Sequence, residues 1–156
     1  NCYNFFLRHP LIMARQFPSE WSLKRLQQSD NQDFVVEYFG GIPYLVRYVQ
    51  RSEQRSTQKA TINCQADFKL TVLKEGDVVV LNPTEYQNQV IKGSILPIVQ
   101  ALLLNMEEGD KVEAICPAAL GDLDGSDADV YVELSLDKIH RYTGITLVFP
   151  ASPVAQ

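Results

Sequence analysis

An acidic loop near the C-terminal end has the residue spacing closest to that of a metal site. It runs Asp122-Leu123-Asp124-Gly125-Ser126-Asp127-Ala128-Asp129. Asp122, Asp124 and Ser126 approximate the first oxygen ligands of an EF-hand calcium loop, and Glu133 follows near its last ligand position. Asp127, however, occupies the position where such a loop needs glycine, and Glu133 lies in a predicted strand with no flanking helix pair. We therefore interpret this segment as a solvent-exposed loop before the last strand. A calcium-binding module ranks third, behind the two candidate functions given at the end of this subsection.

Histidine and cysteine residues form no pattern typical of catalysis or zinc binding. His9 and His140 are far apart in sequence and lack the partner spacing of a metal site or a catalytic triad. Cys2, Cys64 and Cys116 are an odd number without C-x-x-C spacing, so we expect Cys64 and Cys116 to be buried thiols. We expect no catalytic acid or base, no metal and no cofactor.

Composition restricts the partners and the class of protein. The 156 residues are 46% hydrophobic, which fits one domain with extensions. The net charge of -5 and the pI near 5.0 disfavour nucleic acid, because the field of the protein would repel a polyanion. The apolar start Phe5-Phe6-Leu7 is interrupted at Arg8, far short of the roughly 20 residues of a membrane-spanning helix. No later segment qualifies, so we expect a soluble or peripheral protein.

The N-terminal third predicts an extension followed by the start of a sheet. Ser19 is placed to cap a short helix, with Phe17 before it and apolar residues at helical spacing after it. Gly40-Gly41 then predicts a break. The alternation in 44–49 predicts a strand after that break.

The remaining segments predict strands around one buried helix. Alternating apolar residues predict strands over 62–70, 111–116 and 130–136, and a short apolar run predicts another over 78–81, ended by Asn82-Pro83. After Gly93, Ser94 is placed to cap a helix that is apolar on nearly every side, as in a helix enclosed by its fold. Alternation at 145–149 indicates an additional edge strand. We predict an α+β fold: a curved antiparallel β-sheet wrapped around one central helix, preceded by a partly helical extension.

Four short motifs, in this order, resemble the C-terminal half of an FKBP-type peptidyl-prolyl cis-trans isomerase domain. They are Val90-Ile91-Lys92-Gly93-Ser94, Met106-Glu107-Glu108-Gly109-Asp110-Lys111, Ile115-Cys116-Pro117 and Val132-Glu133-Leu134. Residues 41–46 also resemble the entry segment of the longer, Mip-like members. Because each motif is short, the resemblance rests on the order and spacing of the motifs along the chain. It implies an FKBP-like domain at 41–140, between an N-terminal extension (1–40) and a C-terminal tail (141–156).

The resemblance also implies a proline pocket, in which a twisted imide is favoured by aromatic and apolar surroundings rather than by an acid, base or metal. In the family, the residues at Val90 and Ile91 supply backbone and apolar contacts to the proline ring, and both match here. Most other pocket residues differ. Ser94 stands where the floor Trp is expected, Cys64 where a Tyr is expected, and Val130 where a Phe is expected.

The pocket loop that follows Pro117 contains Leu120 and no Tyr, and the Phe-Asp pair of the family is missing as well. Loss of a Trp floor removes several kcal/mol of apolar burial, on the order of what a large ring contributes. Three other aromatic residues, Phe68, Tyr86 and Tyr131, are the candidates to refill the space. We therefore predict a vestigial substrate pocket of Val90, Ile91, Cys64, Ser94, Leu120 and Val130.

The leading hypothesis is an FKBP-like binding or assembly subunit of a larger complex, with a weak or inactive pocket. The alternative is a functional peptidyl-prolyl isomerase that acts in protein folding. Phe5, Phe6 and Trp21 are predicted to contact other protein subunits, with packing on the chain's own sheet as the equal alternative. A proline-containing polypeptide is the other expected partner, and peripheral membrane association through a complex stays open. The resemblance slightly favours an organellar compartment, such as the thylakoid lumen, or an exported one after leader cleavage.

Overall fold

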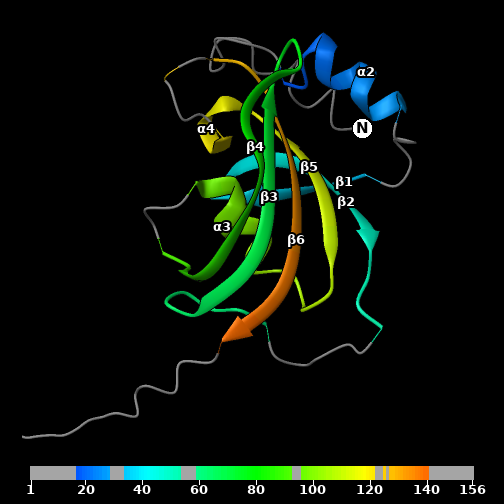
Figure 1. Cartoon of the computed structure of the whole chain (residues 1–156). Coiled ribbons are helices and arrows are strands. Elements are labelled where there is room, and N and C mark those ends of the chain that lie inside the picture. Colours follow the sequence, from blue (N-terminus) through cyan, green and yellow to red (C-terminus); the bar gives the residue numbers. More distant parts are fainter. Residues whose placement is uncertain are drawn as a thin grey trace, which may run out of the picture.

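A six-stranded antiparallel sheet is the centre of the computed structural model, which describes residues 17–28, 34–53, 59–92, 96–121, 125 and 127–140. The elements are α2 (Glu20–Gln28), β1 (Val35–Phe39), β2 (Ile42–Gln50), β3 (Gln65–Lys74), β4 (Val78–Val90), α3 (Pro97–Leu103), β5 (Lys111–Cys116), α4 (Ala118–Gly121) and β6 (Val130–His140). The strand order is β1-β2-β5-β6-β3-β4, and every neighbouring pair is antiparallel. The sheet curves around α3 (Figure 1), so the predicted α+β fold is confirmed.

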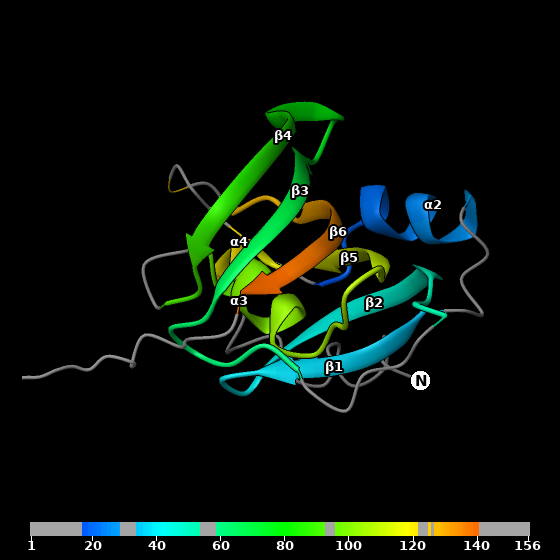
Figure 2. The same ribbon diagram turned by 60° about the horizontal axis from the view of Figure 1, so that its bottom comes forward.

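The concave face of the sheet packs on α3 and forms the main core. Figure 2 shows α3 in the hollow between the β1–β2 and β3–β4 hairpins. Ile98, Leu102 and Leu103 of this helix are buried, as the apolar pattern around its whole circumference predicted. In β3, Ala66, Phe68, Leu70 and Val72 are buried while the residues between them are more exposed. This period of two places one side of the strand in the core.

The convex face is covered by α2, which forms a second apolar cluster there. Phe17 and Leu26 from the N-terminal segment pack with Leu45, Ile115 and Tyr131 of the sheet. All five are at least 97% buried. The segment before β1 therefore contributes to the core rather than only extending from it.

Polar contacts fix the first turn of α2 to the loop before β6. The Ser22 N–H donates to Ser19 Oγ at 3.2 Å, so Ser19 caps the helix as predicted. Asp129 accepts from the Ser19 N–H at 2.8 Å and from Ser22 Oγ at 2.7 Å. Burial raises the pKa of the Asp129 carboxyl, although these hydrogen bonds act in the opposite direction.

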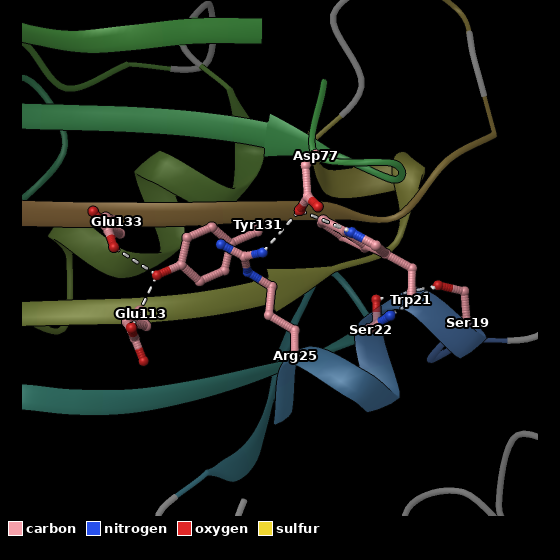
Figure 3. A network of polar contacts seen from close by, with 8 residues as sticks. All are labelled: Ser19, Trp21, Ser22, Arg25, Asp77, Glu113, Tyr131 and Glu133. Atoms are coloured by element: carbon pink, nitrogen blue, oxygen red, sulfur yellow. Dashed lines mark hydrogen bonds and ion pairs between the residues drawn. The ribbon is translucent and has the colours of Figure 1, made fainter. Parts of the chain in front are cut away.

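A second group of contacts ties the helix to the β3–β4 turn (Figure 3). The Arg25 guanidinium lies 4.0 Å from the Tyr131 ring centroid and 3.1 Å from Asp77 Oδ1. Trp21 Nε1 donates to the same Asp77 oxygen at 3.2 Å. Trp21, Arg25 and Asp77 therefore hold the helix against one end of the sheet.

The interpretation of Gly40-Gly41 as a break is wrong. The two glycines have φ of 58° and 80° and form the turn between β1 and β2, whose residues pair from Phe39 with Ile42 to Val35 with Val46. Positive φ suits glycine in a tight hairpin turn. Residues 35–39 consequently belong to the same sheet as the strands that follow.

Strand β4 also differs from the expectation, because it continues through Asn82-Pro83 to Val90. Its pairing with β3 shifts between Leu70 opposite Thr84 and Val72 opposite Leu81. Pro83 thus lies at an irregularity in an edge strand, where a missing N–H removes no ladder hydrogen bond.

Smaller differences concern element boundaries. Strand β3 begins at Gln65, so Ile62 lies before it and is exposed. Helix α3 has Leu96 rather than Ser94 as its N-cap, with Pro97 at its first position. Ser94 and the predicted strand at 145–149 lie outside the described residues. No helix among the described residues is long and apolar enough to cross a membrane.

Candidate functional site

Four residues of the predicted pocket are packed in the main core. Cys64, Ile91, Leu120 and Val130 are all more than 90% buried and belong to the apolar cluster around α3. Val90 is partly exposed at the end of β4. These side chains fill space inside the fold.

The backbone around Ile91 is engaged by the segment before β3. The Ile91 N–H donates to the Cys64 carbonyl at 2.9 Å, and the Asn63 N–H donates to the Ile91 carbonyl at 2.7 Å. Both backbone groups of Ile91 are therefore satisfied within the chain. A bound ligand could use the Ile91 N–H only by displacing the Cys64 carbonyl.

An apolar cavity of about 210 Å³ lies on the concave face, and we call it the β3–β4 cavity. Phe68 and Tyr86 face each other in it, with ring centroids 5.1 Å apart and ring planes at 25°. Such offset stacking favours a rigid aromatic wall. The described lining residues are Phe68, Leu70, Val72, Leu81, Tyr86, Gln89, Leu96 and Val99.

Two of the three aromatic residues considered as replacements line the β3–β4 cavity, and the third does not. Tyr131 lies on the convex face, where its hydroxyl is 2.9 Å from Glu113 Oε2 and 2.7 Å from Glu133 Oε2. Burial, together with the two carboxylates, raises the pKa of Tyr131, so the hydroxyl stays protonated. Tyr131 is a structural residue under α2.

The arrangement of helices and sheet is similar to that of solved FKBP structures. FkpA from Escherichia coli has a TM-score of 0.55 at 12% identity, with 75% of this chain and 57% of FkpA covered. The chain has the FKBP fold. A peptidyl-prolyl cis-trans isomerase from Pseudomonas syringae pv. tomato gives a TM-score of 0.52 at 15% identity, with 81% of this chain and 99% of that chain covered. The structure of the three FKBP domains of wheat FKBP73 gives a TM-score of 0.53 at 15% identity, with 62% of this chain and 44% of that chain covered.

The similarity to FKBP proteins is structural, because no family model and no curated protein sequence matches the chain. The chain also spans less than two thirds of FkpA and of the wheat protein. The FKBP fold explains why the motifs resemble that family in their order.

A second cavity, of about 540 Å³, lies between the β1–β2 hairpin and the C-terminal end of α3, and we call it the hairpin cavity. None of its described lining residues was among the site residues predicted from the sequence. The alternation of Tyr44, Val46 and Tyr48 was the available signal, because it places three large side chains on one face of β2. The described lining residues are Val35, Glu37, Tyr44, Val46, Tyr48, Arg51, Leu102 and Asn105.

The metal and thiol expectations can be located for the described residues only. Glu133 lies in β6, and no group of three or more metal-ligating side chains occurs in the described part of the chain. Asp122, Asp124 and Ser126 lie outside it. Cys64 and Cys116 are buried free thiols, as predicted, and burial raises the pKa of Cys116.

The three aromatic residues expected to bind a partner are placed unequally. Trp21 packs against the convex cluster and donates to Asp77, which corresponds to packing on the chain's own sheet. Phe5 and Phe6 lie outside the described residues.

Proposed function

We propose that this FKBP-fold chain is a protein-binding or assembly subunit of a larger complex, with a prolyl isomerase pocket that is weak or inactive. The observation that carries the proposal is the hydrogen bond from the Ile91 N–H to the Cys64 carbonyl, together with the complete burial of the Ile91 side chain. The resemblance assigns this backbone and side chain to the bound proline. In this chain they are used to join β4 to the start of β3.

The physical reason for low activity is the loss of selective contacts to the twisted imide. Catalysis requires interactions that are stronger in the transition state than in the ground state. Cys64, Leu120 and Val130 have no aromatic ring or hydroxyl and are packed in the core, so they offer none to a substrate. An apolar residue of a partner chain could still enter the β3–β4 cavity, whose walls are mostly aliphatic and aromatic.

A functional isomerase is the second candidate, because one observation favours it. Phe68 and Tyr86 stack beside Leu96, which is the N-cap of α3 and lies two positions after Ser94. An aromatic wall close to that helix start would partly replace the missing Trp floor. The β3–β4 cavity is therefore the site at which either candidate function should be tested.

The test combines catalysis and binding of one proline-containing tetrapeptide. In a protease-coupled assay, we expect the isomerisation rate to stay within about twofold of the uncatalysed rate. In NMR titrations of the same peptide, we expect shifts at Phe68, Tyr86 and Leu96. Tyr86→Ala should weaken that binding about tenfold, the effect of losing an aromatic contact.

Tyr38→Ala is the matched control, because Tyr38 is an exposed tyrosine on β1 outside the described lining of the β3–β4 cavity. Acceleration of about a hundredfold that is lost in Tyr86→Ala and kept in Tyr38→Ala would establish the isomerase instead. Absence of both acceleration and peptide-induced shifts would contradict a peptide-binding role for this cavity.

Partner contact through Phe5, Phe6 and Trp21 is part of the same proposal. Trp21 is partly exposed on α2, so part of its side chain is available to another subunit. An organellar or exported compartment stays a prediction.

A further inference from the structure

The hairpin cavity is lined by Tyr44, whose hydroxyl has no hydrogen-bond partner among the described residues. The residue as a whole is only 2% exposed. Burial, with a contribution from nearby Glu37, raises the pKa of Tyr44 to about 12. The hydroxyl is therefore a donor at neutral pH, and a ligand in the cavity can supply its acceptor.

Two opposite charges line the same cavity without an ion-pair partner among the described residues. Arg51 stacks on Tyr48, with its guanidinium carbon 3.7 Å from the ring centroid. Glu37 projects from β1 toward the cavity. Neither forms an ion pair with a described residue. A ligand with charges of both signs would complement them.

Strand β1, beside the hairpin cavity, is an edge strand with few features that would prevent another strand from pairing with it. Among the described strands, β1 has β2 on one side and no partner on the other. Its pairing with β2 is regular, and its sequence Val35-Val36-Glu37-Tyr38-Phe39 contains neither proline nor lysine. The opposite edge, β4, contains Pro83 and several register shifts, which discourage pairing. Val35 and Tyr38 are both more than half exposed.

We propose that the free edge of β1 and the hairpin cavity together bind an extended peptide segment of another protein, added as a seventh strand. Its backbone pairs with β1. Every second side chain of the peptide faces the cavity, and these are, in order, a basic, an apolar and an acidic residue. The basic residue pairs with Glu37, the apolar residue packs on Val35, and the carboxylate reaches Arg51. This site is separate from the β3–β4 cavity and does not depend on its activity.

The order of the three side chains follows from the register of the hairpin. Residues opposite each other on neighbouring strands lie side by side, so the basic residue is placed next to Glu37. Two positions further, the added strand passes Val35, which pairs with Val46. Strand β2 continues to Gln50 beyond that pair, so Arg51 is reached by the part of the peptide beyond the end of β1.

Charge at Glu37 also argues for a different protein rather than a second copy of this chain. Glu37 is the central residue of β1. An antiparallel pair of two β1 strands that matches all five residues would put Glu37 opposite Glu37 of the second copy. Like charges directly opposite each other destabilise a sheet. A basic residue at that position of the added strand removes the repulsion.

The proposal can be tested with two labelled peptides of the same composition and the full chain. The first contains Lys-Thr-Val-Thr-Asp, in which the lysine, valine and aspartate side chains lie on one face of the strand. The second contains Thr-Lys-Val-Asp-Thr, which moves both charges to the opposite face. By fluorescence polarisation, we expect saturable binding of the first peptide and affinity at least about tenfold lower for the second. Hydrogen exchange at β1 backbone amides should slow only with the first peptide.

Charge exchange identifies the contacts. Glu37→Lys should weaken the first peptide about tenfold and restore binding when its lysine is replaced by glutamate. Arg51→Glu should do the same for a peptide whose aspartate is replaced by lysine. Glu85→Lys is the matched control, because Glu85 is an exposed carboxylate on the other edge strand. It should leave the affinity unchanged.

Several outcomes would overturn the proposal. They are equal affinity for the two peptides, no saturation by about 1 mM of the first, or failure of both charge exchanges to restore binding. Slow exchange of β1 amides in the peptide-free monomer would assign the edge to another segment of the same chain. Concentration-dependent dimerisation that slows exchange of the β1 amides would assign it to a second copy.

Discussion

Opposing physical effects act on the pKa of the Asp129 carboxyl group. It is 97% buried, which disfavours its charge, and it accepts hydrogen bonds from Ser19 and Ser22, which favour that charge. Burial is the largest contribution, and Glu75 adds to it, so the pKa is raised in the folded chain. The folded state therefore binds the proton more tightly than the unfolded state does.

Asp129→Asn should change how stability depends on pH. Because the pKa of Asp129 is raised on folding, the free energy of unfolding of the unmodified chain should fall, relative to the variant, as pH rises from about 4 through the raised pKa. Urea unfolding between pH 4 and 8 measures this difference. Asp137→Asn, an exposed change in β6, controls for removal of one charge. A relative increase with pH would mean that the hydrogen bonds outweigh burial.

Individual side-chain roles were only partly predictable from the sequence. Ser19 was identified as a cap because capping depends on residues close in sequence. The use of Asp129 was not found, since its two partners are 107 and 110 positions away. Pairing of the Ile91 N–H with Cys64 was missed for the same reason: it depends on how two segments meet in space.

At the scale of elements, α2 acts as the cover of the convex face. Leu26 is 1% exposed and lies in the cluster with Leu45 and Ile115. This cluster, which also contains Tyr131, joins the N-terminal segment to β2, β5 and β6. The strength of that contact should be visible in the stability of the whole chain.

Leu26→Ala should lower the free energy of unfolding by about 2 to 5 kcal/mol, the usual cost of removing a large buried aliphatic side chain. Chemical denaturation followed by tryptophan fluorescence measures it, because Trp21 is on the same helix. Gln27→Ala, exposed on α2, should change it by less than about 0.5 kcal/mol. Equal effects of the two variants would contradict docking of α2 on the sheet.

The elements that the sequence predicted well are those with a regular apolar pattern. Strand β5 has the predicted bounds, and α3 is enclosed as its apolar circumference indicated. Strand β1 was missed. Gly40-Gly41 indicates a turn, but it does not indicate that the residues on its two sides pair as strands. Strand β4 was ended too early at Pro83, since tolerance of proline there depends on its edge position.

At the scale of the molecule, the curved sheet has its two faces covered by helices from different parts of the chain. The main cluster lies around α3 and the second lies under α2. Motif order in the sequence was sufficient to predict the FKBP fold. The two cavities could not be predicted, because each is lined by residues from at least three elements whose relative positions are set by packing.

A chain that begins at Phe34 should retain the sheet but lose its convex cover. Leu45, Ile115 and Tyr131, which are now at most 3% exposed, would then face solvent. We expect a lower thermal midpoint and increased fluorescence of a hydrophobic dye, relative to the full chain, because an apolar patch is uncovered. Equal midpoints and equal dye signals would show that α2 contributes little to stability.

The strand order has a consequence for synthesis on the ribosome. The two central strands, β5 and β6, are the last to be made, whereas the hairpins on either side of them are made earlier. Neither hairpin can join the other until residues 111–140 have left the exit tunnel, and α2 has no complete surface to dock on before then. The nascent chain therefore carries exposed strand edges until late in translation, which is the period when a chaperone would protect it from aggregation.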